Sequence, residues 1–243
     1  MRRFFVEDID EQTRSARIAG AEFAHLKRVL RLRAGDVVAL FNGKGLELHG
    51  TVEEVGRDFA EVTVRGRARE SHESPVEVIL LQGLLKGDKP EFIIQKATEL
   101  GAAEVSFYTT ARTVPLAPNR SKEARWRKVA IEAAKQCGRT VVTRVTVAGD
   151  LKDATAGREG FLKLALWEGI GEAGGMRDAL RGTEAERVVV LVGPEGGFSG
   201  EDVEAAQREG FRSVGLGPRI LRAETAAVAA LTILQYELGD LDT

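Results

Sequence analysis

The sequence predicts an α/β protein with a mostly parallel sheet, preceded by a small β-rich domain that we expect to be a compact barrel. Two observations lead to this fold class. Up to about Pro75, short segments alternate apolar and polar residues, as half-buried strands do. Beyond Pro75, strand-like and helix-like segments alternate, which is typical of a parallel sheet covered by helices on both faces. We therefore expect two domains, at residues 1–70 and 76–243.

The first domain contains a strong hairpin signal. Its Asn-Gly-Lys-Gly sequence at residues 42–45 favours a tight turn between antiparallel strands, because asparagine and glycine accept the positive φ angles of such turns. A short helix is expected before it, at residues 21–32. The polar, irregular segment 67–75 is interpreted as the linker. The strands predicted in this domain lie at residues 36–41, 46–55 and 59–64.

The helices of the second domain carry start and stop signals. A helix at residues 89–100 begins after Asp88, a good N-cap residue, and stops at Gly101. Another begins at Ser199, with Asp202 three residues on as in a capping box. An apolar stripe of helical period and a run of alanine and leucine predict two more, at 126–137 and 223–238. The predicted strands are 76–85, 103–109, 141–147, 161–167, 187–192 and 213–216.

Composition excludes several classes of protein. Hydrophobic residues make up 43% of the chain, which supports a complete core and argues against global disorder. We see no signal peptide and no stretch near the roughly 18 apolar residues that span a bilayer, so we expect a soluble cytoplasmic protein. The single cysteine, Cys137, excludes an internal disulfide and fits a reducing compartment. No metal-ligand cluster is recognisable, so no metal is expected.

The net charge of −2 hides one basic segment. From Arg112 to Arg144 there are nine lysines and arginines against only Glu123 and Glu132. Such a run forms either a solvated helix face or a contact for polyanions such as RNA.

Three strand ends of the second domain carry residues that are unusual for simple loops. They are LWEG at 166–169, LVGPEGGFSGED at 191–202 and LGPRILRAET at 216–225. Each alone is compatible with ordinary loop geometry, but ligands of open α/β sheets bind beyond the carboxyl ends of the strands, so three together favour a site. The grip residues of a phosphate-binding loop are missing, which disfavours a phosphate-dependent nucleotide. The remaining backbone groups, small residues and arginines suit a cofactor that brings its own reactivity, and S-adenosylmethionine fits.

The pair LVGPEGGFS and LGPRILRAETA resembles the signature of the ribosomal RNA small subunit methyltransferase E family. KGDKPEFIIQKATELG at 86–101, EAAKQCGR at 132–139, MRRFF at 1–5 and HLKRVLR at 25–31 resemble other segments of that family. The resemblance implies a SPOUT-type, trefoil-knotted C-terminal domain, a PUA-like RNA-binding barrel, and a homodimer. It further implies methylation of uridine N3 in 16S ribosomal RNA with S-adenosylmethionine. It assigns the cofactor contacts to Leu166, Val192, Gly193, Pro194, Glu195, Gly197, Leu216, Gly217, Ile220, Leu221 and Ala223.

Methyl transfer to uracil N3 needs alignment and help with loss of the N3 proton. We expect Arg222 to stabilise the negative charge that grows on the uracil oxygens. Glu224 either orients Arg222 through an ion pair or acts as the base. Alternatively, both residues are structural and pair across the dimer.

The target uridine must be unpaired or flipped out, and basic residues must hold its RNA. The candidates for RNA contact are Arg2, Arg3, His25, Arg28 and Arg31 in the first domain and Arg112, Arg120, Arg125, Lys128 and Arg139 in the second. Two other functions stay open: a SPOUT methyltransferase acting on ribose 2′-oxygen or guanine N1, and a ribosome-binding protein without catalysis.

Overall fold

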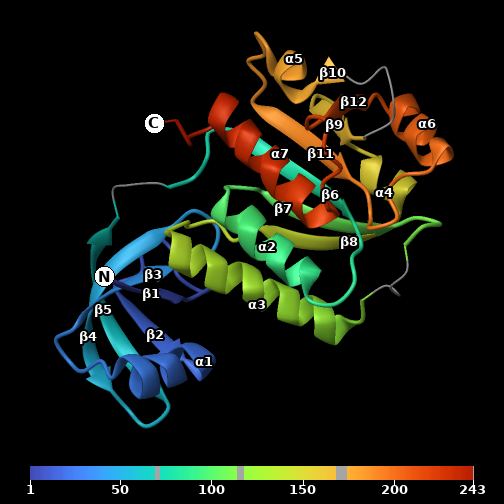
Figure 1. Cartoon of the computed structure of the whole chain (residues 1–243). Helices are drawn as coiled ribbons and strands as arrows, with labels where there is room; N and C mark the ends of the chain where they lie inside the picture. The colour runs from blue at the N-terminus through green and yellow to red at the C-terminus, as the bar shows by residue number, and fades with distance from the viewer. Residues whose placement is uncertain (69–71, 114–117, 168–173, 243) are drawn as a thin grey trace. The chain divides into compact units, whose positions relative to one another are not determined.

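The computed structural model describes residues 1–68, 72–113, 118–167 and 174–242 (Figure 1). It divides into two compact units. The first contains Met1–Glu73 with Ala134–Val142, and the second contains Ser74–Ala133 with Thr143–Thr243. The sequence-based division at residues 70 and 76 did not include residues 134–142 in the first unit. Residues 69–71 of the predicted linker lie outside the described residues.

The first unit is built on a mixed five-stranded sheet in the order β1-β3-β4-β5-β2. β1 pairs with β3 in parallel, and the other neighbours are antiparallel. The predicted hairpin at residues 42–45 is confirmed, since it joins β3 to β4. β1 and β2 stand at the two edges of the order, so the compact barrel that we predicted is a curled half-barrel. The strands are β1 (Arg2–Phe5), β2 (Ser15–Ala19), β3 (Val37–Phe41), β4 (Glu47–Val55) and β5 (Phe59–Arg67).

The helix of the first unit differs from its prediction at residues 21–32. It consists of α1 (Gly20–Ala24) followed by a π-helical turn, η1 (His25–Leu30). Arg31 stops it with a left-handed backbone, at φ 54°, and its N–H donates to the Leu26 carbonyl. The wider turn keeps Leu26 fully buried in the core of the unit.

The second unit contains a seven-stranded sheet in the order β10-β12-β9-β11-β6-β7-β8. Every neighbouring pair is parallel, which confirms the predicted parallel sheet. β8 begins three residues later than predicted. Val141, which we had placed in this strand, belongs to the first unit and forms β-bridges with Gly43 and Lys44 of that unit. The strands are β6 (Glu77–Gly83), β7 (Glu104–Thr109), β8 (Arg144–Asp150), β9 (Leu162–Leu166), β10 (Gly174–Gly175), β11 (Arg187–Val192) and β12 (Arg212–Gly215).

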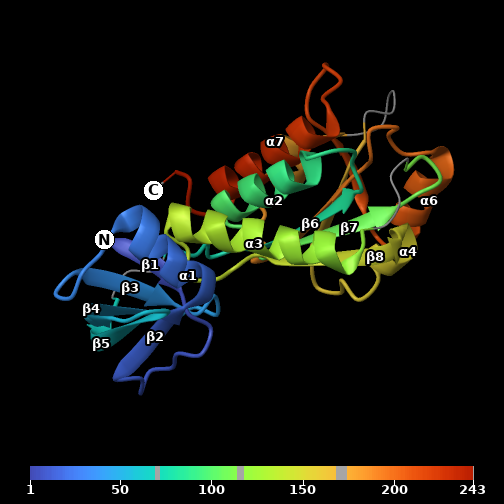
Figure 2. The same cartoon turned by 90° about the horizontal axis from the view of Figure 1, so that it is seen from below.

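Helices cover both faces of this sheet, as expected (Figure 2). α2, α3 and α7 lie side by side on one face, where Trp126 of α3 packs on Phe107 with ring centroids 4.6 Å apart. On the other face, side chains of α4 and α6 share a core cluster with Ile79, Leu81 and Leu191. The helices are α2 (Lys89–Glu99), α3 (Arg120–Cys137), α4 (Leu151–Thr155), α5 (Met176–Leu180), α6 (Gly200–Arg208) and α7 (Ala223–Glu237).

Both predicted N-cap positions are confirmed, but only Ser199 forms side-chain capping hydrogen bonds. The Ser199 hydroxyl accepts the Asp202 N–H at 3.1 Å, and the Asp202 carboxylate accepts the Ser199 N–H at 2.9 Å. Asp88 stands at the N-cap position of α2, as predicted, but its side chain accepts no cap hydrogen bond, because its backbone (φ −92°, ψ 1°) is not the extended form that a capping side chain needs. The short elements β1, β2, β10, α4 and α5 were not predicted. Among the described residues, no helix is long and apolar enough to cross a membrane.

Candidate functional site

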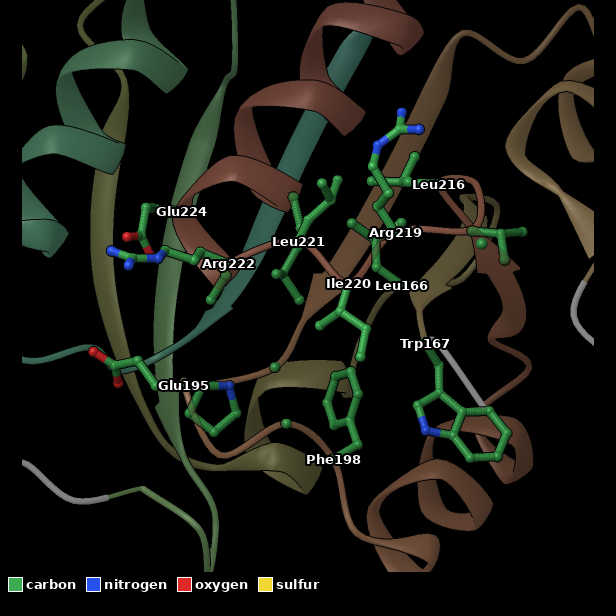
Figure 3. Close-up of a pocket in the computed structure, with 18 of the residues that line it drawn as sticks. Leu166, Trp167, Glu195, Phe198, Leu216, Arg219, Ile220, Leu221, Arg222 and Glu224 are labelled. Atoms are coloured by element: carbon green, nitrogen blue, oxygen red, sulfur yellow. The ribbon is translucent and has the colours of Figure 1, made fainter. Parts of the chain in front are cut away.

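A cavity of about 420 Å³ lies at the carboxyl ends of β9, β11 and β12 (Figure 3). Its lining comes from the last residues of these three strands, the turns that follow them and the start of α7, together with Lys89 of α2. Parallel strands present all their carboxyl ends at one edge, which is why turns distant in sequence meet here. Glu168 and Gly169, which we had included in the first turn, lie outside the described residues.

The cavity has the size of a small-molecule site, for which about 300–1,000 Å³ is typical. All eleven positions that the resemblance assigns to the cofactor line it, and so do Arg222 and Glu224. Seven further lining residues had been given no individual role, although Trp167, Phe198 and Arg219 lie in the three turns predicted to form a site. The seven are Lys89, Trp167, Phe198, Val214, Gly215, Arg219 and Ala226.

The glycine turn, residues 193–198, crosses close over the end of β6. A Cβ at Gly83 would lie 2.3 Å from the Pro194 nitrogen and 2.8 Å from the Gly193 carbonyl carbon, so only glycine fits there. Beside it, the Gln82 amide nitrogen donates to the Gly83 and Gly193 carbonyls, each at 3.0 Å. Inside the turn, Gly197 takes a φ of +67° and donates its N–H to Pro194. The turn is therefore fixed by backbone contacts that small residues permit.

Arg112 anchors the glycine turn from the β7 side. Its Nη1 donates to the Gly196 carbonyl at 3.2 Å and to the Phe198 carbonyl at 2.9 Å. A Cβ at Gly196 would lie 3.1 Å from the Arg112 backbone oxygen, so any larger residue would need a small shift of Arg112. We had predicted that Arg112 contacts RNA. The residue is exposed, but its guanidinium already donates to these two carbonyls.

A cluster of charges stands at one side of the cavity. The Lys89 ammonium lies 3.2 Å from Glu195 and 3.4 Å from Glu224, and the Lys86 backbone N–H donates to Glu195 at 3.1 Å. Burial by itself would raise the pKa of Glu195, but the hydrogen bonds from Lys86 and Lys89 outweigh it and leave that pKa lowered. Lys89 and Glu195 are far apart in sequence, so no local pattern could have joined them.

Arg222 and Glu224 both face the cavity, on the same side as Glu195 (Figure 3). Arg222 is exposed and directly precedes α7, whereas the Glu224 side chain is only 16% exposed. Within the described part of the chain, Glu224 forms its ion pair with Lys89 and not with Arg222. Of the two roles expected for Glu224, the ion pair with Arg222 is therefore corrected, because the lysine of α2 takes that place; the role as base stays a prediction.

The structure separates the RNA candidates of the first unit. Arg2, Arg28 and Arg31 are exposed, and His25 is half-buried. Arg3 is only 13% exposed, pairs with Glu47 and donates to the carbonyls at the end of α3. Because these partners use its guanidinium within the fold, we no longer include Arg3 among the RNA contacts.

The remaining RNA candidates lie on or after α3. Arg120, Arg125 and Lys128 are exposed, and Arg125 pairs with Glu91 at 2.8 Å. The Arg139 side chain is only 6% exposed and pairs with Glu73 at 2.8 Å. A buried, paired guanidinium holds the fold together and is not available to phosphate, so Arg139 is also removed from the candidates.

Comparison with known proteins identifies the family. Residues 72–235 match the family described as RNA methyltransferase domain, and residues 18–65 match the RNA methyltransferase PUA domain. The ribosomal RNA small subunit methyltransferase E of Bacillus subtilis is 33% identical over 98% of this chain and 97% of its own length. The chain belongs to the ribosomal RNA small subunit methyltransferase E family. The Synechocystis member of the ribosomal RNA small subunit methyltransferase E family is 33% identical over 87% of the chain and 69% of its own length.

Two solved structures extend the comparison. The ribosomal RNA small subunit methyltransferase E of Neisseria gonorrhoeae, bound to S-adenosylmethionine, is 29% identical with a TM-score of 0.89, and the match covers 99% of both chains. A putative methyltransferase of Legionella pneumophila, in complex with the same cofactor, is 30% identical with a TM-score of 0.89 over 98% of both chains. The motifs quoted from the sequence thus indicated the correct family, and the half-barrel of the first unit is its PUA domain.

Proposed function

We propose that this protein uses S-adenosylmethionine to methylate N3 of a uridine in 16S ribosomal RNA. The observation that carries the proposal is the cavity formed by the paired family motifs, in a chain with two relatives solved with this cofactor. The substrate follows from the family, whose members act on small-subunit ribosomal RNA. A role on ribosomes also places the protein in the cytoplasm in our proposal, which cell fractionation tests.

The residues of the cavity fit S-adenosylmethionine. Leu166, Leu216 and Leu221 offer apolar contacts for the adenine, and the backbone of the glycine turn offers polar groups without a phosphate grip. When bound, this cofactor supplies an electrophilic methyl group on a sulfonium, whose leaving thioether is neutral. The protein therefore needs to orient the uracil and manage one proton, and it needs no acid for the leaving group.

Arg222 and Glu224 are the residues that we propose for this task. Arg222 has an exposed guanidinium at the cavity and stabilises negative charge on the uracil oxygens as the N3 proton leaves. Glu224 accepts that proton in our proposal, because its carboxylate lines the same cavity. The effect of removing Arg222 is argued in the Discussion.

The RNA is held, in our proposal, by the exposed cations Arg2, Arg28 and Arg31 of the PUA domain, with His25 beside them, and by Arg120, Arg125 and Lys128 of α3. Arg112 stays a weaker candidate, since its guanidinium is engaged with the glycine turn. Phosphate contacts of this kind release counterions, so binding must fall with salt.

Replacing Arg28 and Arg31 together with alanine is expected to weaken RNA binding and to flatten its salt dependence. Each lost contact with a single strand removes about 0.7 from the slope of log K against log salt, so the slope should change by about 1.4. Fluorescence anisotropy with a 16S fragment at several salt concentrations measures this. Arg17→Ala is the control, because Arg17 is exposed in the same unit but pairs with Glu61. An unchanged slope in the double variant would remove both arginines from the interface.

A homodimer is also part of the proposal. Large apolar side chains are exposed in the second unit, including Phe92 at 44%, Ile220 at 81% and Tyr236 at 58%, and a second copy would cover such groups. Sedimentation velocity over a concentration series is expected to give the mass of two chains. A single-chain mass at micromolar concentration would contradict it.

The SPOUT class and its trefoil knot stay predictions, which an electron-density trace from β9 through α7 checks.

The function itself is tested in two steps. Calorimetry is expected to show binding of S-adenosylmethionine, and the absence of binding would favour the ribosome-binding protein without catalysis. Mass analysis of nucleosides from 16S RNA treated with enzyme and cofactor is expected to give 3-methyluridine. A ribose-methylated nucleoside or 1-methylguanosine would instead establish one of the other methyltransferase activities. Primer extension on ribosomal RNA from a knockout strain then locates the nucleotide.

A further inference from the structure

We propose that Lys89 is a positioning residue of the methyl-transfer site. Its ammonium group bridges Glu195 of the glycine turn and Glu224 of α7, and so holds two walls of the cavity together. The catalytic consequence of this inference rests on the proposed function, whereas the existence of the bridge does not depend on any activity.

The bridge joins three elements that the sequence separates. Lys89 opens α2, Glu195 follows β11, and Glu224 lies in the first turn of α7. The ammonium stands 3.2 Å from the Glu195 Oε1 and 3.4 Å from the Glu224 Oε2. All three residues line the cavity, so a change in their spacing changes the shape of the site.

The bridge is partly shielded from water. The Lys89, Glu195 and Glu224 side chains are 34%, 28% and 16% exposed. The Glu224 Oε2 atom is buried and forms no hydrogen bond within the described residues, so its compensation comes from the nearby Lys89 charge. A carboxylate atom in this state is costly without a cation beside it. Removing the ammonium would leave two like charges facing one another at the rim of the site.

The contacts assign Lys89 to positioning and not to direct contact with the cofactor or RNA. Its ammonium is already shared between two carboxylates. Arg219 and Arg222 line the same cavity and form no ion pair within the described part of the chain, so they are the cations available to ligands. Lys89 therefore acts through Glu195 and Glu224, by fixing the glycine turn against the start of α7.

The first test compares Lys89→Met, which keeps the length of the side chain, with Lys89→Arg, which keeps the charge. For Lys89→Met we expect kcat to fall about tenfold to a hundredfold, since small misplacements in an active site have effects of this order. Lys89→Arg should recover most of that loss. Lys96→Met is the matched control on the same helix, because Lys96 pairs with Glu99 away from the cavity. Wild-type kcat and cofactor affinity in Lys89→Met would overturn the inference.

A second test does not depend on activity. Carbon-detected NMR of the side-chain carboxyl groups follows the pKa of Glu195, which the Lys89 contact helps to lower. In Lys89→Met this pKa should rise toward its ordinary value, whereas in Lys96→Met it should stay unchanged. An unchanged Glu195 pKa in Lys89→Met would disprove the bridge. If the wild-type protein binds no S-adenosylmethionine, the proposed function fails, and this titration still decides whether the bridge exists.

Discussion

Replacing Arg222 with alanine is expected to lower the rate of methyl transfer about 10²–10³-fold and to change cofactor affinity by no more than a few-fold. Removing one preorganised group that stabilises developing charge typically has an effect of this size. The rate is affected selectively because the charge on the uracil oxygens develops only as the N3 proton leaves. The stability of the fold should stay the same, since the Arg222 side chain is exposed and forms no capping hydrogen bond with α7. Single-turnover kinetics and calorimetry with S-adenosylmethionine measure the two effects separately.

Two further variants make this prediction specific. Arg222→Lys keeps a positive charge but not the planar guanidinium, so partial activity is expected. Arg219→Ala removes the neighbouring arginine of the same cavity. It tests whether the rate depends on the position of Arg222 or only on the positive charge in the cavity. A wild-type rate in Arg222→Ala would show that Arg222 has no part in the reaction. An equal loss of cofactor binding would instead assign it to the cofactor.

Replacing Gly83 with alanine is expected to destabilise the second unit by about 1–3 kcal/mol, the usual cost of forcing extra atoms into a packed site. The new Cβ would lie 2.3 Å from the Pro194 nitrogen and 2.6 Å from its Cδ. These are atoms of the backbone and of a rigid ring, so the glycine turn itself must move. Cofactor affinity should therefore fall together with stability. Urea denaturation and calorimetry with S-adenosylmethionine measure the two losses.

Gly200→Ala is the matched control for this substitution. A Cβ at Gly200 would meet nothing within 4 Å, and Gly200 begins α6, where alanine is the better helix former. We expect its stability to equal or exceed that of the wild type. If Gly83→Ala is as stable and binds as tightly as Gly200→Ala, the close crossing of the turn over β6 is not what shapes the site.

Local patterns predicted most of the second unit because its elements are long and well marked. The helix after Ser199 was recognisable from two polar residues three positions apart, and its hydrogen bonds are those expected. Asp88 also marked the start of its helix correctly, but its side chain forms no cap, because the backbone at that residue is not extended. A capping side chain is a local preference, and the tertiary path of the chain overrides it.

The sequence alone was enough to predict the family, the parallel sheet and thirteen of the positions that line the cavity, since these depend on short motifs and on the period of apolar residues. Tertiary structure decided which charges meet. It paired Glu224 with Lys89, whereas an ion pair with Arg222 was one of the two roles expected for Glu224, and it engaged Arg3 and Arg139 inside the first unit. The physical reason is that an ion pair depends on distance in space, which neighbours in sequence do not specify.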